Sequence, residues 1–283
     1  MKHVFKSLKE YGFNTENRAY VIAEIGINHG GSLDAAKRLI DSASEAGVDA
    51  VKFQTYITEK RVSKNSPIFG ILKKCQLPLE SFREIKNYAQ LRKVDFISTP
   101  FDEESIACLK EIECDIYKVA SFDLVNHKLL SSLSKLNKTI IMSAGMADLG
   151  EIQQAYKILN PKKNKIVILY CVSAYPTKEE DANLAAIYTL KDKFDCIIGH
   201  SDHTDDIVVP LYAVAAGAQI IEKHYKLDAN MDCADSAISI TQVQMAKLTR
   251  EIERLGRIIG QGAVGPTLAQ KACMVYRRRS KKT

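Results

Sequence analysis

Short apolar runs rich in β-branched residues alternate along the chain with longer segments that have one apolar and one polar face. Alternation of this kind is typical of repeated strand-then-helix units. The pattern predicts eight strands: Tyr20–Gly26, Asp49–Gln54, Asp95–Thr99, Ile116–Ser121, Thr139–Ser143, Ile166–Cys171, Cys196–Ser201 and Gln219–His224. It predicts eight helices: Leu33–Ala46, Leu79–Lys93, Glu103–Ile112, Lys128–Leu136, Leu149–Leu159, Leu184–Lys193, Ile207–Ala216 and Thr241–Ile259.

The predicted strands are apolar on both faces, as in VIAEIG and KIVILY. Such strands suit a parallel sheet covered by helices. Eight successive units in roughly 240 residues predict an α/β fold of the (β/α)8 TIM-barrel type. A doubly wound open sheet is the alternative, although it rarely uses eight uninterrupted units. The connection Tyr56–Pro78 is unusually long, and connections of that length are often functional.

Composition supports a single globular domain with short extensions. The chain has 283 residues, of which 46% are hydrophobic and 26% charged. We expect an N-terminal extension over residues 1–17, a barrel domain over residues 18–262 and a basic C-terminal tail over residues 263–283. No apolar run approaches the ~20 residues that span a bilayer, and the N-terminus lacks the apolar core of a secretory signal, so no membrane association is expected.

Charge and cysteine content narrow the function classes further. The net charge is +6, and five of those charges lie in the final RRRSKKT, so the rest of the chain is nearly neutral. This distribution argues against a nucleic-acid-binding face on the barrel, and a solvated terminus is the simplest role for the tail. The seven cysteines are scattered without a CxxC pair, which favours reduced thiols and a cytoplasmic location.

Polar residues gather where the predicted strands end, which is the rim that carries the active site in TIM barrels. Lys52 and Lys118 lie inside apolar strands, where an unpaired charge is very costly. With the hydroxyls of Thr99, Ser121 and Ser143 they would form a cradle for a phosphate or carboxylate. The alternative is that each lysine pairs with an acidic neighbour, namely Glu24, Glu222 or Asp123.

Two histidines follow consecutive strands and should therefore be neighbours. His203 follows the seventh predicted strand and His224 ends the eighth. Two imidazoles beside carboxylates suit a divalent transition metal. His29 and His200 are further candidates for ligands or hydrogen-bond donors.

Several longer motifs resemble the N-acetylneuraminate (sialic acid) synthase family, which includes legionaminic and pseudaminic acid synthases. The similarity covers roughly residues 18–262. It is carried by AEIGINHGGSLDAAKRLIDSASEAGVDAVKFQTY at 23–56, STPFD at 98–102, YKVASFD at 117–123, SAGM at 143–146, CVSAYPT at 171–177, SDHT at 201–204 and IEKHYKLD at 221–228. The resemblance implies a TIM barrel that condenses phosphoenolpyruvate with an N-acetylhexosamine such as N-acetylmannosamine.

The resemblance also implies roles for individual residues. Glu24 matches the acid that positions or activates the attacking water, and His203 and His224 match two metal ligands, usually described with manganese (Mg²⁺ or Co²⁺ are alternatives). Positions that hold phosphoenolpyruvate are matched by Lys52, Thr99, Lys118, Ser121, Ser143, Ser173 and Ser201. Positions near the sugar are matched by Gln54, Asp123, Tyr175 and Asp235.

The chain departs from the family pattern in places. Asp123 is shorter than a frequent glutamate, and Ser236 in MDCADS replaces a frequent histidine. Relatives usually continue from a basic RRS segment into an antifreeze-like domain, which reaches across a dimer and donates an arginine to the partner's sugar site. This sequence stops at RRRSKKT, so we expect a homodimer with a more open sugar site, or a separate chain that supplies the domain.

The expected product is a sialic-acid-like nonulosonic acid together with phosphate. Two alternatives remain open from sequence. One is a phosphoenolpyruvate-dependent synthase acting on a sugar phosphate, although no arginine-rich motif for a distal phosphate is evident. The other is a non-catalytic barrel that binds sugar or a partner.

Overall fold

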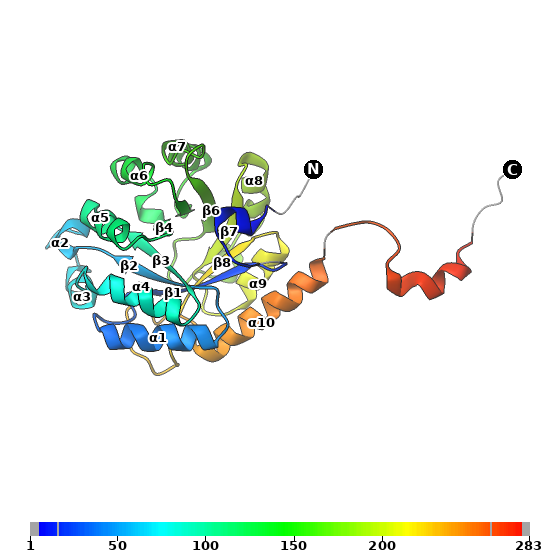
Figure 1. Ribbon diagram of the computed structural model, residues 1–283, viewed down its shortest axis with the longest axis horizontal. Coiled ribbons are helices and arrows are strands. Elements are labelled where there is room, and N and C mark those ends of the chain that lie inside the picture. Colours follow the sequence, from blue (N-terminus) through cyan, green and yellow to red (C-terminus); the bar gives the residue numbers. More distant parts are fainter. Residues whose placement is uncertain (1–5, 16, 261, 279–283) are drawn as a thin grey trace.

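Eight parallel strands close into a barrel in the order β1 to β8 in the computed structural model, which describes residues 6–15, 17–260 and 262–278. Helices surround the barrel (Figure 1). The strands are β1 (Tyr20–Gly26), β2 (Ala50–Thr55), β3 (Asp95–Pro100), β4 (Ile116–Val119), β5 (Thr139–Ser143), β6 (Lys165–Cys171), β7 (Ile197–Asp202) and β8 (Ile220–His224). The register pairs Ile22 with Ala50 and closes the ring through Tyr20 and Ile220. The predicted (β/α)8 architecture is therefore confirmed.

The eight predicted helices are all present, with bounds that differ by a few residues. They are α1 (Leu33–Glu45), α4 (Ser81–Leu91), α5 (Glu103–Glu111), α6 (His127–Leu133), α7 (Leu149–Ile158), α8 (Ala186–Lys193), α9 (Val208–Ala215) and α10 (Gln242–Ile259). Side-chain caps explain several starts: the Ser32 hydroxyl accepts the Ala35 N–H, and Asp102 accepts the Ser105 N–H.

The connection between β2 and α4 holds two helices that the sequence pattern did not predict. They are α2 (Thr58–Arg61) and α3 (Phe69–Cys75), both too short to show clear periodicity. The fourth predicted strand is also shorter than expected. It ends at Val119, and Ser121–Asp123 form a 3-10 turn, η2.

Two apolar layers hold the barrel. One lies between the strands and the surrounding helices. The other fills the barrel interior with residues such as Ile22, Ile97 and Ile141. The 3-10 helix η1 (Leu8–Tyr11) and the segment after it close the N-terminal end, where the Phe13 and Tyr20 ring centroids are 4.8 Å apart. The opposite end of the barrel is left for polar chemistry.

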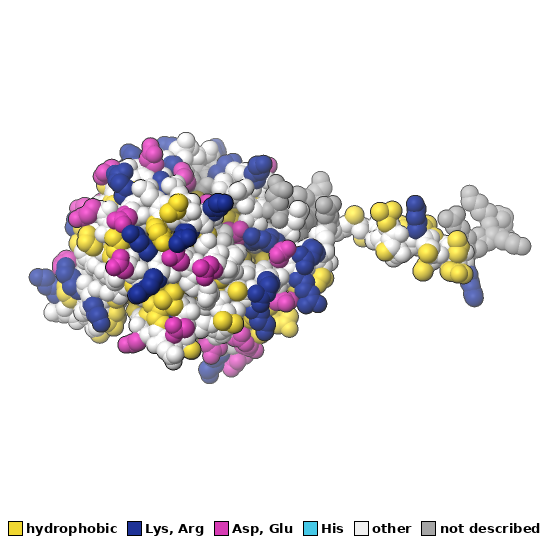
Figure 2. All heavy atoms as spheres, turned by 60° about the horizontal axis from the view of Figure 1, so that its bottom comes forward, with side chains coloured by type: hydrophobic (Ala, Val, Ile, Leu, Met, Phe, Trp, Pro, Cys, Tyr) yellow, Lys and Arg dark blue, Asp and Glu magenta, His cyan; other side chains and the backbone are white. Residues whose placement is uncertain are grey.

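Lysine, arginine and acidic side chains are interspersed over the face of the barrel shown in Figure 2. This mixture agrees with the nearly neutral charge expected for the body of the chain. The 3-10 helix η4 (Leu268–Tyr276) stands away from the barrel. Residues 279–283 of the basic tail lie outside the described residues. Within the described ranges, no helix is both long and apolar enough to cross a membrane.

Candidate active site

A cavity of about 380 Å³ opens at the C-terminal ends of the strands. Its lining includes every residue predicted for catalysis or for substrate or metal binding except Asp123, Ser173 and the further candidates His29 and His200. The predicted residues in the lining are Glu24, Lys52, Gln54, Thr99, Lys118, Ser121, Ser143, Tyr175, Ser201, His203, His224 and Asp235. The structure thus brings together groups from all eight strands or the loops that follow them, as expected of a TIM-barrel active site.

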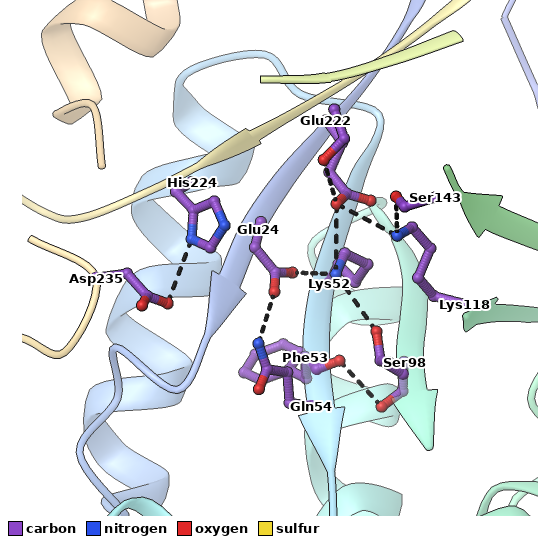
Figure 3. A network of polar contacts seen from close by, with 12 residues as sticks. Glu24, Lys52, Phe53, Gln54, Ser98, Lys118, Ser143, Glu222, His224 and Asp235 are labelled. Atoms are coloured by element: carbon purple, nitrogen blue, oxygen red, sulfur yellow. Dashed lines mark hydrogen bonds and ion pairs between the residues drawn. The ribbon is translucent and has the colours of Figure 1, made fainter. Parts of the chain in front are cut away.

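Two buried lysines and two buried glutamates of the cavity lining form a network of ion pairs (Figure 3). Lys52 Nζ lies 2.8 Å from Glu24 Oε2 and 3.6 Å from Glu222 Oε1. Lys118 Nζ lies 3.6 Å from the same Glu222 oxygen. Both lysines are at most 4% exposed. The expected pairing of each lysine with an acid therefore holds for Glu24 and Glu222.

The two ammonium groups differ in how tightly they hold their protons. Burial opposes the charge of Lys52, but Glu222 and Glu24 together raise its pKa above the usual value. Burial, with a contribution from the nearby Lys52, lowers the pKa of Lys118. Burial opposes ionisation of Glu222 as well, yet Lys118 and Lys52 hold its pKa at about 2. Glu222 is thus shared by both ammonium groups, whereas Glu24 pairs with Lys52 alone, so Lys118 has no carboxylate of its own.

Hydroxyl groups surround the same two lysines. Lys118 Nζ donates to Ser143 Oγ at 2.5 Å, and Lys52 Nζ donates to Thr99 Oγ1 at 3.4 Å. Ser201 donates to Glu222 at 3.0 Å, and the Gly145 N–H donates to Ser121 Oγ at 3.1 Å. Ammonium and hydroxyl donors therefore gather around the two lysines in the cavity lining, which suits a phosphate or carboxylate.

The two predicted metal-binding histidines, His203 and His224, both line the cavity, and their ring centroids are 5.5 Å apart. His203 Nδ1 donates to the Val172 carbonyl oxygen at 2.6 Å, which leaves Nε2 with a free lone pair. Burial, together with His224, lowers the pKa of His203 to about 4, so its imidazole is neutral at physiological pH. His224 Nδ1 lies 3.3 Å from Asp235 Oδ2.

Asp235 sits on a loop that is fastened to the barrel by Asn28. The Asn28 side chain donates to the Tyr225 carbonyl at 2.9 Å and to Ser239 Oγ at 3.0 Å, and it accepts the Asp235 N–H at 2.9 Å. All polar atoms of this buried amide are used, as buried polar groups require. Asn28 therefore fixes the position of Asp235 beside His224.

Two residues predicted to bind substrate lie beside the cavity rather than in its lining. Asp123 accepts a hydrogen bond from Asn126 Nδ2 at 2.9 Å in η2. Ser173 lies against Gly145: a Cβ added at that glycine would be only 2.2 Å from Ser173 Oγ. Their roles toward substrate stay predictions.

The other candidate histidines do not line the cavity. His200 points to the outer side of β7, where Nε2 lies 3.4 Å from Asp202 Oδ1 and the ring stacks on Tyr170. Strand alternation explains this, because its neighbour Ser201 faces inward. His29 Nδ1 accepts the Gly31 N–H at 3.1 Å, and its ring lies beside Phe53.

Sequence analysis missed Arg61, Phe101 and the apolar rim of the cavity formed by Ile68 and Ile71. Arg61 lies on α2 and Ile71 on α3, Ile68 immediately precedes α3, and Phe101 follows β3. The other site residues were identified because they lie at the ends of predicted strands. None of these four residues ends a predicted strand, and three of them lie in the connection between β2 and α4. The unusual length of that connection was the one signal in the sequence.

Comparison with known proteins places this geometry in context. The chain is 40% identical over 262 residues to an uncharacterized protein of Methanocaldococcus jannaschii, covering 92% of this chain and 78% of that relative. It is 37% identical to the N,N'-diacetyllegionaminic acid synthase of Campylobacter jejuni, covering 87% of this chain and 78% of that relative.

A solved structure resembles the whole barrel. The N-acetylneuraminic acid (sialic acid) synthetase of Leptospira borgpetersenii superposes with a TM-score of 0.89 and 41% identity, covering 92% of this chain and 91% of that chain. The NeuB family profile matches residues 39–264, which is most of the barrel. The chain therefore belongs to the NeuB family.

Proposed function

We propose that the chain condenses phosphoenolpyruvate with an open-chain N-acetylated amino sugar, N-acetylmannosamine or a related sugar, to give a sialic-acid-like nonulosonic acid and phosphate. The observation that carries this proposal is the polarity of the cavity. Two buried ammonium groups lie among several hydroxyls and beside the Glu24 and Glu222 carboxylates, and the Gln54 amide, Asp235 and two imidazoles line the same cavity. The legionaminic and sialic acid synthases among the relatives support the same chemistry.

The two lysines explain why the cavity suits phosphoenolpyruvate, which carries a phosphate and a carboxylate group on adjacent carbon atoms. Lys52 and Lys118 would neutralise this anion, and Ser121, Ser143 and Ser201 would donate hydrogen bonds to it. Because these donors are held in place by the barrel before substrate arrives, they stabilise charge at the reacting centre without reorganising.

The reaction makes one carbon–carbon bond and one carbon–oxygen bond to water, and it breaks the carbon–oxygen bond to phosphate. The methylene carbon of phosphoenolpyruvate attacks the aldehyde carbon of the sugar, whose oxygen takes up a proton and becomes a hydroxyl. The adjacent carbon, now cationic, is attacked by water that Glu24 holds and deprotonates. The tetrahedral species then loses phosphate, so no nucleophilic serine or cysteine is needed.

The described residues fit a divalent metal at the two histidines. His203 is neutral and has a free Nε2, His224 is its neighbour, and the Asp235 carboxylate touches His224. No group of three or more protein ligands forms within the described part of the chain, so water and substrate oxygens would complete the coordination. When bound, such an ion would supply a Lewis acid beside the sugar aldehyde.

Manganese as the ion, a homodimeric assembly and a cytoplasmic location stay predictions. The sugar-phosphate synthase and the non-catalytic barrel are the two outcomes that the following experiment separates from the proposed function.

The decisive assay is phosphate release from phosphoenolpyruvate in the presence of Mn²⁺ and a panel of N-acetylhexosamines, their 6-phosphates and 2,4-diacetamido-2,4,6-trideoxyhexoses. We expect release that depends on an uncharged amino sugar, with the nine-carbon or longer acid detected by mass spectrometry. Release only with a sugar phosphate would favour the alternative synthase. Absence of release with every sugar, despite phosphoenolpyruvate binding, would favour a non-catalytic barrel.

Gly145 gives a second test, focused on the phosphate cradle. A Cβ at this position would lie 2.2 Å from Ser173 Oγ and 2.8 Å from both Cys171 Sγ and Ser121 Oγ. Overpacking of this kind costs about 1–3 kcal/mol, so Gly145→Ala should weaken phosphoenolpyruvate binding roughly 5- to 150-fold. Calorimetric titration measures this, and Gly70→Ala is the matched control because nothing lies within 4 Å of an added Cβ there. If Gly145→Ala and Gly70→Ala bind phosphoenolpyruvate equally well, the phosphate does not bind near Gly145.

A further inference from the structure

Arg61, the last residue of α2, lines the cavity, and its guanidinium is held on three sides. Its central carbon lies 3.6 Å from the Phe101 ring centroid and 4.8 Å from that of Tyr56. Nη1 donates to Gln54 Oε1 at 2.9 Å. Stacking on two aromatic rings and one hydrogen bond fix the plane and direction of a side chain that is otherwise highly flexible.

The guanidinium keeps hydrogen-bond donors that the protein does not use. An arginine carries five N–H donors, and within the described residues the bond to Gln54 is the one hydrogen bond of this group. Burial lowers the pKa of Arg61, although Tyr56, Asp123, Asp235 and Glu24 oppose that effect. A charged, largely desolvated group in the cavity lining, with spare donors, requires an acceptor.

The hydrogen bond from Arg61 also orients a residue next to Glu24. Because Arg61 holds the Gln54 carbonyl oxygen, the Gln54 amide nitrogen points the other way, and it donates to Glu24 Oε1 at 3.2 Å. Figure 3 shows the Gln54 amide beneath the Glu24 carboxylate. Arg61 thus acts on the position of Glu24 through one intervening side chain.

We propose that Arg61 is a sugar-binding and positioning residue: its free N–H groups donate to an oxygen of the amino sugar, and its bond to Gln54 holds Glu24 in place. This inference rests on the proposed condensation. It assigns the connection between β2 and α4 a part in binding the sugar.

The charges around Arg61 identify the kind of oxygen that it binds. The Glu24 and Asp235 carboxylates line the same cavity as this guanidinium, and Gln54 links Glu24 to it by hydrogen bonds. A phosphate brought to the same place would be repelled by them, since like charges in a partly buried site disfavour each other strongly. The acceptor is therefore uncharged, a hydroxyl or an acetamido carbonyl, and the substrate class is a neutral amino sugar.

The test compares three substitutions at one position. Arg61→Met keeps an unbranched stem against Phe101 but has no donor, Arg61→Lys keeps a positive charge, and Arg61→Ala removes both. Lys60→Ala is the matched control. It also removes a cation from α2, but Lys60 pairs with Glu104 at the surface. Thermal unfolding establishes that each variant is folded.

Two measurements separate binding from positioning. Steady-state phosphate release gives KM for each substrate and kcat, and calorimetry with the sugar alcohol, which lacks the reactive aldehyde, gives sugar affinity without turnover. We expect Arg61→Met and Arg61→Ala to raise the sugar KM and weaken binding of the sugar alcohol roughly 10- to 100-fold. The KM for phosphoenolpyruvate should change less than about twofold, kcat should fall as Glu24 loses its support, and Arg61→Lys should recover part of both effects.

The outcomes are distinct for this inference and for the proposed function. The role of Arg61 is overturned, and the proposed function stays intact, if two results are found together. The wild-type chain condenses the sugar, and Arg61→Met keeps the wild-type sugar KM and affinity for the sugar alcohol. Loss of phosphoenolpyruvate affinity instead of sugar affinity also overturns it. A wild-type chain that neither binds the sugar alcohol nor releases phosphate with any sugar overturns both.

Discussion

Substitution of Lys118 by alanine is expected to weaken phosphoenolpyruvate binding by about 2–5 kcal/mol, which corresponds to a loss of roughly 30- to 5,000-fold in affinity. The side chain is 2% exposed, and its ammonium group lies between Ser143 Oγ and Glu222. A contact of this ammonium with the substrate anion is therefore shielded from water and poorly screened by salt. Glu222 would keep Lys52 as its partner, so the empty site should still fold.

Calorimetry with phosphoenolpyruvate measures this effect, and the sugar alcohol provides the comparison ligand. Lys118→Met, which preserves the length of the side chain, should behave like Lys118→Ala if charge rather than packing is responsible. Lys138→Ala removes a lysine that pairs with Asp115 at the opposite end of the barrel, and it should have no effect. Unchanged affinity in Lys118→Ala and Lys118→Met would place the anion elsewhere.

The sequence predicted the fold well because its strongest signal is the one that a parallel barrel requires. Each strand is a short apolar run, since it is covered on both faces, and all but one of these runs were located to within about one residue at their ends. The exception is the fourth strand, where Ser121–Asp123 turn away as η2. The chain changes from apolar to polar at Ala120 and Ser121, but this change does not show where hydrogen bonding to the neighbouring strands ends.

The site was predictable where strand direction determines it. Lys52, Ser143 and Ser201 face the interior because side chains alternate along a strand, and strand ends meet at one rim. The same alternation sends His200 outward to Asp202, although sequence analysis kept it as a candidate ligand. Arg61 was missed because it lies on a helix of four residues, where no periodicity signals which way a side chain points. The contacts of Asp123 and Ser173 depend on the conformation of their loops, which the secondary-structure propensities of individual residues do not determine.

Removal of divalent metal is expected to reduce condensation to background, and Mn²⁺ or a similar ion should restore it. Without an ion, the uncharged imidazole of His203 supplies no positive charge to the sugar aldehyde, because burial, together with His224, holds the pKa of His203 at about 4. A bound ion typically contributes several kcal/mol of transition-state stabilisation, so a loss of at least about a hundredfold in kcat is expected on dialysis against a chelator.

Substitutions of the two histidines test the same site independently of activity. His203→Ala and His224→Ala should each weaken Mn²⁺ binding, which can be followed by electron paramagnetic resonance of the free ion. Because both residues serve one ion, the double variant should lose little more activity than either single variant. His127→Ala, on α6 and outside the cavity lining, is the control. Full activity in a chain shown by elemental analysis to be free of metal would overturn the metal assignment, and the two histidines would then act as hydrogen-bonding groups toward the sugar.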